Sequence, residues 1–420
     1  MTTLVTDPAH HDFLRAHAVS LLEFAKDFPA PVGGSGWLDN DGRVDLTQSV
    51  HTWITCRMAH SYSVGALMGV PGAKERAQVA LDGLRGPLKD QINGGWFAAI
   101  PATGSGDHRT DDPVSMVGVD STKAAYAHAF VVLAASSGVR AGLDGAQELL
   151  EEALAVLDSK FFEPAYGLHA DEWDATFSTL DPYRGVNANM HGVEALIAAG
   201  DVTGDARWHD RALAIAKTVA LSWAEPQDWR IPEHFSPTWE PQLELNADRP
   251  DDKFKPYGAT VGHGIEWARL LLHLDATFGA GTHPWLASSA QNLYNRAVAD
   301  GWHEGPSGKM GLVYTTGWDG VPLVTTRLHW VAAEALSAAA ALYQATGNER
   351  YARDYEQWFN HITEYFLDAE RGSWHHELNT DNEPTAHVWP GKPDIYHAFQ
   401  AVLMPLAPLA PSLASSAGRL

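Results

Sequence analysis

Helical segments of two kinds alternate along the 420-residue chain, and this alternation restricts the fold more than any other feature. One kind has a charged face and an apolar face, as in a helix that is half exposed to water. It is predicted at 11–28, 73–91, 145–162, 206–223, 285–302 and 349–367. The other kind is small or apolar almost all round, which is typical of a buried helix. It is predicted at 47–69, 121–137, 188–200, 261–279, 327–346 and 394–407.

The links between these helices alternate in length. Links from a buried to an amphipathic helix are short, whereas the reverse links are long and rich in glycine and aromatic residues, as in 93–100, 166–174, 229–239, 309–320 and 372–384. Long loops in a compact domain are usually functional, and these contain short alternating stretches that predict β-hairpins. We therefore expect an all-α (α/α)6 barrel of six helical hairpins, with these loops at the active-site end. An open solenoid of helix pairs would give the same local pattern.

Domain organisation and compartment follow from composition. The barrel is expected to be one catalytic domain over 1–408, followed by a Pro/Ala/Ser-rich tail at 409–420 that should be flexible. The net charge of −23 repels phosphate backbones, so nucleic acid is an unexpected partner. The single cysteine, Cys56, excludes an intrachain disulfide and a cysteine-cluster metal site. Neither a signal peptide nor a membrane span is evident, which predicts a cytoplasmic chain without a membrane partner. The oligomeric state stays open.

The buried helices carry polar residues at matching positions, at intervals of 65 to 72 residues. A lone histidine on an apolar helix is usually a core residue. Equivalent positions of a closed repeat, however, converge on the barrel axis, so the set as a whole predicts an active site at the barrel mouth. These residues are Arg57, Tyr126, His191 with Glu194, His263 with Glu266, His329 with Trp330 and Glu334, and His397 with Gln400.

The residue types favour proton transfer. Imidazoles suit proton abstraction and return near neutral pH, and an arginine can stabilise an enediolate oxygen. The H-x-x-E spacing of His191–Glu194 and His263–Glu266 places both side chains on one helical face, where the glutamate could fix the histidine tautomer. Paired metal sites usually use the reverse spacing, Glu-x-x-His, so no metal and no cofactor are expected. These features favour a cofactor-free sugar isomerase or epimerase.

Five motifs resemble those of the N-acylglucosamine 2-epimerase superfamily, and most of all its branch of mannose and sulfoquinovose isomerases. They are TCRMAHSY, NMHGVEA, GHGIEWARLLLHL, HWVAAEA and GKPDIYHAFQA. The resemblance covers about residues 10–408. It implies an (α/α)6 barrel that acts on free aldoses without a required metal.

The resemblance also implies roles for individual residues. Arg57 would stabilise a substrate oxygen, His263 and His397 would be the acid/base pair, and Glu266 would orient or assist His263. Helix 327–346 begins with His329–Trp330 where the epimerase branches have a tryptophan pair, which argues against N-acylglucosamine or cellobiose as substrate. The expected substrate contacts are Tyr126, His191, Glu194, Trp330, Gln400, Trp389 and Glu377.

The implied reaction interconverts D-mannose and D-fructose, with lyxose and xylulose as a further pair. The ring opens, the C2 proton leaves, and a cis-enediol is protonated at C1. We expect His397 to be the C2/C1 base and His263 to serve ring opening and oxygen proton transfer, although their division of labour stays open. The acidic surface and Glu377 favour a neutral monosaccharide, while Lys253 and Lys255 point toward an anionic one. The alternatives are a sulfoquinovose isomerase, a sugar 2-epimerase, and an (α/α)6 hydrolase or lyase using Glu194 and Glu266.

Overall fold

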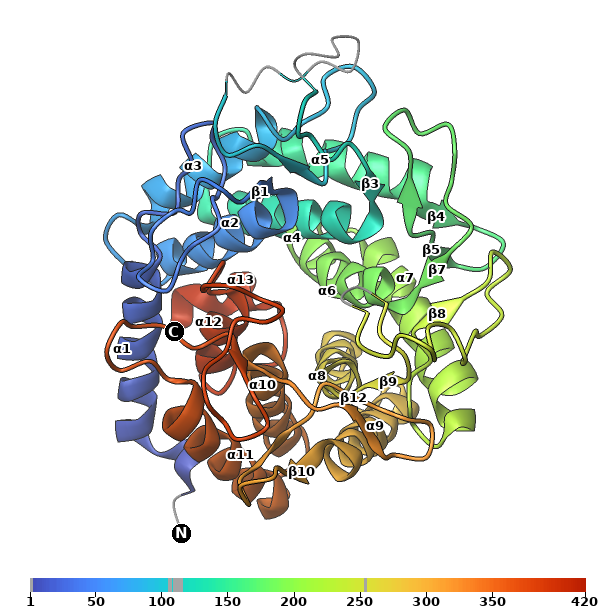
Figure 1. Ribbon diagram of the computed structural model, residues 1–420. Helices are drawn as coiled ribbons and strands as arrows, with labels where there is room; N and C mark the ends of the chain where they lie inside the picture. The colour runs from blue at the N-terminus through green and yellow to red at the C-terminus, as the bar shows by residue number, and fades with distance from the viewer. Residues whose placement is uncertain (1–2, 105–107, 109–115, 253–254) are drawn as a thin grey trace.

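Two concentric rings of helices make up the computed structural model, which describes residues 3–104, 108, 116–252 and 255–420 (Figure 1). The inner ring consists of α2 (Thr52–Leu67), α4 (Ala125–Ala141), α6 (Val186–Thr203), α8 (Val261–Phe278), α10 (His329–Thr346) and α12 (Tyr396–Leu403). The outer ring consists of α1 (Pro8–Phe24), α3 (Ala73–Arg85), α5 (Ala146–Val156), α7 (Ala206–Lys217), α9 (Pro284–Gly301) and α11 (Glu349–His361). Contacts between α12 and α2 close the inner ring, which confirms the barrel and rejects the open solenoid.

The two helix types pack as their residue patterns predict. Helix α10 is buried at every position from Val331 to Leu342, and its many alanines let neighbouring helices approach closely. Helix α11 instead buries one stripe of aromatic residues and exposes its charges. Shorter helical segments extend or flank the rings at Leu4–Thr6, Leu157–Phe161, Thr218–Ala224, Glu225–Gln227, Ile362–Phe366, Leu413–Ser416 (α13) and Ala417–Arg419.

Short antiparallel strands tie the long loops together. The strand just before an inner helix pairs with a strand of the next long loop. The five pairs are β1 (Val50–His51) with β2 (Ala99–Ile100), β3 (Lys123–Ala124) with β6 (Glu172–Trp173), β7 (Arg184–Gly185) with β8 (His234–Phe235), β9 (Ala259–Thr260) with β12 (Thr315–Thr316), and β14 (Arg327–Leu328) with β15 (Glu377–Leu378). Hairpins within one loop are formed by β4 (Phe162–Glu163) with β5 (Leu168–His169), β10 (Trp302–Glu304) with β11 (Met310–Leu312), and β12 with β13 (Pro322–Val324). The expected hairpins are thus present, and pairing between loops fixes the relative positions of the inner-helix N-termini.

Buried ion pairs hold the same loops. A basic residue just before an inner helix pairs with an acidic residue that follows an outer helix. Lys123 Nζ lies 2.7 Å from Asp90, and Lys392 Nζ lies 2.8 Å from Asp368. Removing one partner of such a pair would leave a buried charge uncompensated, so these pairs anchor the mouth of the barrel.

The C-terminal segment differs from the sequence expectation of a flexible tail at 409–420. It packs across the end of the barrel opposite the long loops, where α13 contacts α2, α4 and α6. His273 Nδ1 donates to the carbonyl oxygen of Leu409 at 2.6 Å, Ser412 N donates to Asp201, and Leu413 is buried. The physical reason is that the leucines and alanines of this segment cover apolar helix ends that would otherwise face water.

No helix in the described residues is long and apolar enough to cross a membrane.

Candidate active site

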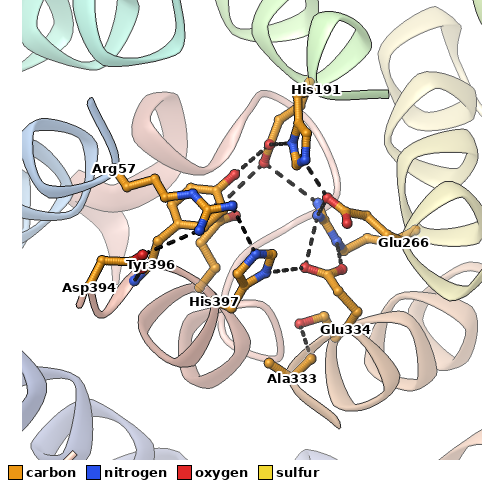
Figure 2. A network of polar contacts seen from close by, with 12 residues as sticks. Arg57, His191, Glu266, Ala333, Glu334, Asp394, Tyr396 and His397 are labelled. Carbon is orange, nitrogen blue, oxygen red and sulfur yellow. Dashed lines mark hydrogen bonds and ion pairs between the residues drawn. The ribbon is translucent and has the colours of Figure 1, made fainter. Parts of the chain in front are cut away.

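Side chains from the inner helices meet on the barrel axis, as the repeat spacing predicts (Figure 2). Hydrogen bonds, ion pairs and ring contacts connect residues from all six inner helices, and most of these residues are buried. The predicted residues brought together there are Arg57, Tyr126, His191, Glu194, His263, Glu266, Trp330, His397 and Gln400.

His397, on α12, lies between a carboxylate and a guanidinium group. Its Nδ1 lies 3.2 Å from Glu334 Oε1, and its Nε2 lies 3.3 Å from Arg57 Nη2. Because the carboxylate can only accept, the proton belongs on Nδ1, and the Nε2 lone pair is left facing the guanidinium. Burial lowers the pKa of His397 below 6.5, and Glu334 acts against this by raising it. The imidazole is therefore a neutral, oriented base near neutral pH.

Arg57, on α2, supplies a fixed positive charge beside this base. Its Nη1 lies 3.3 Å from Asp394 Oδ2, and its Nη2 donates to the Tyr126 hydroxyl at 3.0 Å. The guanidinium carbon also lies 4.7 to 4.8 Å from the ring centres of Trp53, Phe130 and Tyr396. A cation fixed in this way can stabilise negative charge that develops on a substrate oxygen without having to reorganise.

A second histidine–glutamate pair lies nearer the mouth, and it corrects one expectation. His263 Nδ1 lies 2.8 Å from Glu233 Oε1, so Glu233, and not Glu266, orients this histidine. His263 is in the first turn of α8 and is only partly buried. Glu266 is one turn deeper and faces His191. The Trp330 ring contacts both acid/base candidates, with centroid distances of 5.4 Å to His263 and 5.9 Å to His397.

The floor of the site is a cluster of carboxylates around Arg269. Its Nε donates to Glu334 Oε2 at 2.8 Å, its Nη2 lies 3.5 Å from Glu266 Oε1, and its Nη1 lies 3.9 Å from Glu194 Oε1. Glu194 also accepts hydrogen bonds from Tyr396 and from Gln400. Glu194 is therefore part of this floor, and it lies 3.9 Å from His191 Nδ1.

Glu377, which the sequence predicted to contact substrate, is bonded to the backbone of a loop of the chain itself. It is buried, and its carboxylate accepts three backbone N–H groups, from His387 at 3.0 Å, Val388 at 2.7 Å and Trp389 at 2.9 Å. These hydrogen bonds anchor the 387–389 loop, and a contact of Glu377 with substrate stays a prediction. Trp389 in turn stacks on Trp37, with centroids 6.0 Å apart, in an aromatic wall that reaches Arg57 through Trp53.

Three residues that hold the site together were missed in the sequence. Arg269 had a detectable signal, because it is a charged residue on an otherwise apolar helix, three residues after Glu266. Glu233 and Asp394 precede their helices in irregular chain, where no periodicity marks a position as facing the axis.

One cluster in the described part of the chain has the donor types of a metal site. Atoms of His191, Glu194 and Glu266 lie within 4.8 Å of one another. The guanidinium of Arg269 lies beside both carboxylates and already supplies positive charge there. That charge opposes a cation in the same place, and the expectation of a metal-free enzyme stays a prediction.

Comparison with known proteins places this geometry in a family. The sequence pattern of N-acylglucosamine 2-epimerase (GlcNAc 2-epimerase) matches residues 33–401. The chain belongs to the N-acylglucosamine 2-epimerase family. The D-mannose isomerase of Thermobifida fusca is 46% identical over 99% of both chains, and that of Pseudomonas cannabina pv. alisalensis is 42% identical over 97% of this chain and 95% of its own.

A solved structure supports the same family placement. The crystal structure of a D-mannose isomerase superposes with a TM-score of 0.86 at 29% identity, covering 95% of this chain and 99% of the other. The resemblance seen in the five sequence motifs is thereby confirmed, as is the (α/α)6 barrel of this family. The roles of individual residues stay predictions.

Proposed function

We propose that this chain is an aldose–ketose isomerase that interconverts D-mannose and D-fructose. The observation that carries the proposal is the Glu334–His397–Arg57 arrangement, a neutral oriented base next to a permanent cation. The relatives named D-mannose isomerase match the chain over nearly its full length, which supports mannose as the aldose. Lyxose, which shares the configuration of mannose at C2, is the expected second substrate.

The geometry supports a mechanism based on proton transfer. His263, oriented by Glu233, assists ring opening near the mouth. Nε2 of His397 then takes the C2 proton, the C1–C2 double bond of a cis-enediol forms, and the C1–O1 π bond breaks, so that O1 gains negative charge. The positive charge of Arg57 stabilises the oxygen on which negative charge develops. The proton of O2 passes to O1, the C2–O2 π bond forms as the C1–C2 double bond breaks, and His397 returns its proton to C1, which gives the ketose and restores the neutral imidazole.

Epimerisation at C2 is the second candidate function. It needs two bases on opposite faces of the enediol, whereas isomerisation needs one base on one face. Trp330 contacts both His263 and His397, so two imidazoles do lie at the site. Hydrolysis is less favoured, because Glu194 and Glu266 share His191 and Arg269 and do not flank an open gap.

The charges of the site favour a neutral sugar over a sulfonated one. Within the described residues of the site, Arg57 is paired with Asp394 and Arg269 with Glu334. Lys255 Nζ lies 3.8 Å from the ring centre of Tyr183, and Lys253 lies outside the described residues. A sulfonate would have to compete for these cations inside a chain of net charge −23.

A substrate panel tests the proposal. The purified protein is incubated with mannose, lyxose, glucose and sulfoquinovose, with and without a chelator, and the products are identified by NMR. We expect fructose from mannose and xylulose from lyxose at rates that the chelator does not change. Conversion of sulfoquinovose but not of mannose would contradict the proposed substrate. Glucose formed from mannose before any fructose would favour the epimerase.

The hydrogen bonds of Glu377 to the 387–389 loop give a prediction about substrate binding. Changing Glu377→Gln removes the charge that three backbone N–H groups share, and hydrogen bonds to a charged group contribute about 1.5–3 kcal/mol each. The 387–389 loop should loosen and Trp389 should lose its fixed position. We expect the KM for mannose to rise several-fold with a smaller change in kcat. Glu383→Gln is the matched control, because that exposed carboxylate pairs with Asn379. Equal KM values for both variants would rule out the anchoring role.

A further inference from the structure

Three buried carboxylates share one guanidinium on the floor of the site, so their negative charges are only partly compensated (Figure 2). Glu334 takes the two hydrogen bonds that Arg269 donates, at 2.8 and 3.3 Å. Glu266 receives only a longer contact from Arg269, at 3.5 Å, and is 1% exposed. Glu194 lies still farther from Arg269, at 3.9 Å, but it accepts hydrogen bonds from Tyr396 and Gln400. The least compensated of the three carboxylates is therefore Glu266.

The groups around Glu266 make its ionised form unfavourable. Burial raises the pKa of Glu266 well above 4.5, and the negative charges of Glu334 and then Glu194 raise it further, while Arg269 and Arg57 act in the opposite direction. Arg57 has its own carboxylate partner in Asp394. The titratable and charged groups that face this floor are Arg57 on α2, Tyr126 on α4, His191 and Glu194 on α6, Arg269 on α8, Glu334 on α10, and Tyr396 and His397 on α12.

Two buried polar atoms at this point form no hydrogen bond with any of the described residues. They are Glu266 Oε1 and His191 Nδ1, which lie 3.8 Å apart. Burial lowers the pKa of His191 to about 4, so this imidazole is neutral as well. Buried polar atoms without partners are costly, and these two lie on the axis beside the His397 base. A sugar hydroxyl or carbonyl oxygen would satisfy both of them.

We propose that Glu266 is held as a neutral carboxylic acid and that it transfers the proton between the two sugar oxygens, O1 and O2. This proposal rests on the isomerase function and assigns to Glu266 a task that the resemblance gives to His263. His263 is bonded to Glu233 one turn nearer the mouth, whereas Glu266 lies on the floor with His397. A carboxyl group suits the task because its two oxygens can span the O1 and O2 atoms of a cis-enediol.

The proton transfers balance in two steps. In the first, His397 removes the C2 proton, the C1–C2 double bond forms, the C1–O1 π bond breaks, and Glu266 gives its proton to O1. The enediol then lies between an imidazolium and a Glu266 carboxylate. In the second, the carboxylate takes the proton of O2, the C2–O2 π bond forms, and His397 gives its proton to C1. The ketose leaves, and both groups return to their starting states.

Infrared spectroscopy tests the protonation state without any reliance on catalysis. The difference spectrum between the wild type and Glu266→Gln at neutral pH should contain the C=O stretch of a protonated carboxyl group. Glu233→Gln is the matched control, and its difference spectrum should lack the C=O stretch of a protonated carboxyl group, because Glu233 is bonded to His263. A carboxylate band in place of the acid band for Glu266 would overturn the proposal, even if the protein proved to act on another sugar.

Kinetics test the transfer step. In D2O, Glu266→Gln should still exchange the C2 hydrogen of mannose, because its amide can donate a hydrogen bond to O1 but cannot take the O2 proton. Conversion to fructose should fall by about 10²–10⁴-fold. The ratio of deuterated mannose to fructose should therefore rise strongly. An unchanged ratio, with exchange and conversion falling together, would show a structural role and contradict the proposal, as would full isomerase activity.

Discussion

The variant His397→Asn should convert mannose to fructose at least about 10²–10⁴-fold more slowly than the wild type, which is the usual contribution of a general base. Asparagine retains hydrogen-bonding groups close to Glu334 and Arg57 but cannot accept a proton from carbon. The same loss should appear in the exchange of the C2 hydrogen with solvent, because that step uses the same base. Steady-state rates and NMR exchange measurements on one protein preparation check both.

His361→Asn is the matched control for this result. His361 is a buried histidine on the outer helix α11, so the change costs packing but leaves the axis untouched. We expect its kcat to stay near that of the wild type, with a lower Tm. Near-normal turnover by His397→Asn would contradict the assignment of the base and move it to His263.

Replacing Glu334 with glutamine should have the second largest effect. The change removes the carboxylate that fixes the His397 tautomer and that binds Arg269 twice. Loss of an equivalent orienting carboxylate in a serine protease lowers kcat by about 10⁴-fold, and we expect a fall of similar order here. Breaking the buried pair with Arg269 should also destabilise the fold by about 3–5 kcal/mol, which a denaturant titration would measure.

The pH dependence of kcat/KM distinguishes the loss of the Glu334 contact with His397 from general damage to the fold. In the wild type, activity should be lost as the pH falls through the pKa of His397, which burial places below 6.5. Glu334 raises that pKa, so its removal lowers the pKa further and keeps the imidazole neutral to lower pH. The acid limb of Glu334→Gln should therefore move to lower pH as its plateau falls. A shift to higher pH would contradict the contact between Glu334 and His397.

The barrel and most of the axial residues could be predicted because both depend on periodicity. Helical periodicity separated buried from exposed helices, and the repeat length placed residues such as Arg57, His191 and His397 at one level. The alternation of link lengths put the long loops at one end. Each of these signals is local or recurs at a fixed interval, so a single sequence contains it.

What the sequence did not reveal depends on contacts between distant segments. Glu233 orients His263 from a loop 30 residues earlier, and the three hydrogen bonds of Glu377 go to a loop that begins 10 residues later. Neither contact leaves a periodic trace. The C-terminal segment was expected to be flexible because its proline, alanine and serine content is typical of flexible tails, whereas Leu413, Ala414 and Ala417 are buried only by the assembled barrel.

The central claim is that one base on one face moves a proton between C2 and C1. The direct measurement is the conversion of mannose to fructose in D2O, stopped early, with the position and configuration of deuterium at C1 read by NMR. We predict at most one deuterium per fructose, always in the same prochiral position, with the remaining product carrying the proton transferred from C2, and loss of fructose formation in His397→Asn. Deuterium in both C1 positions would contradict the account.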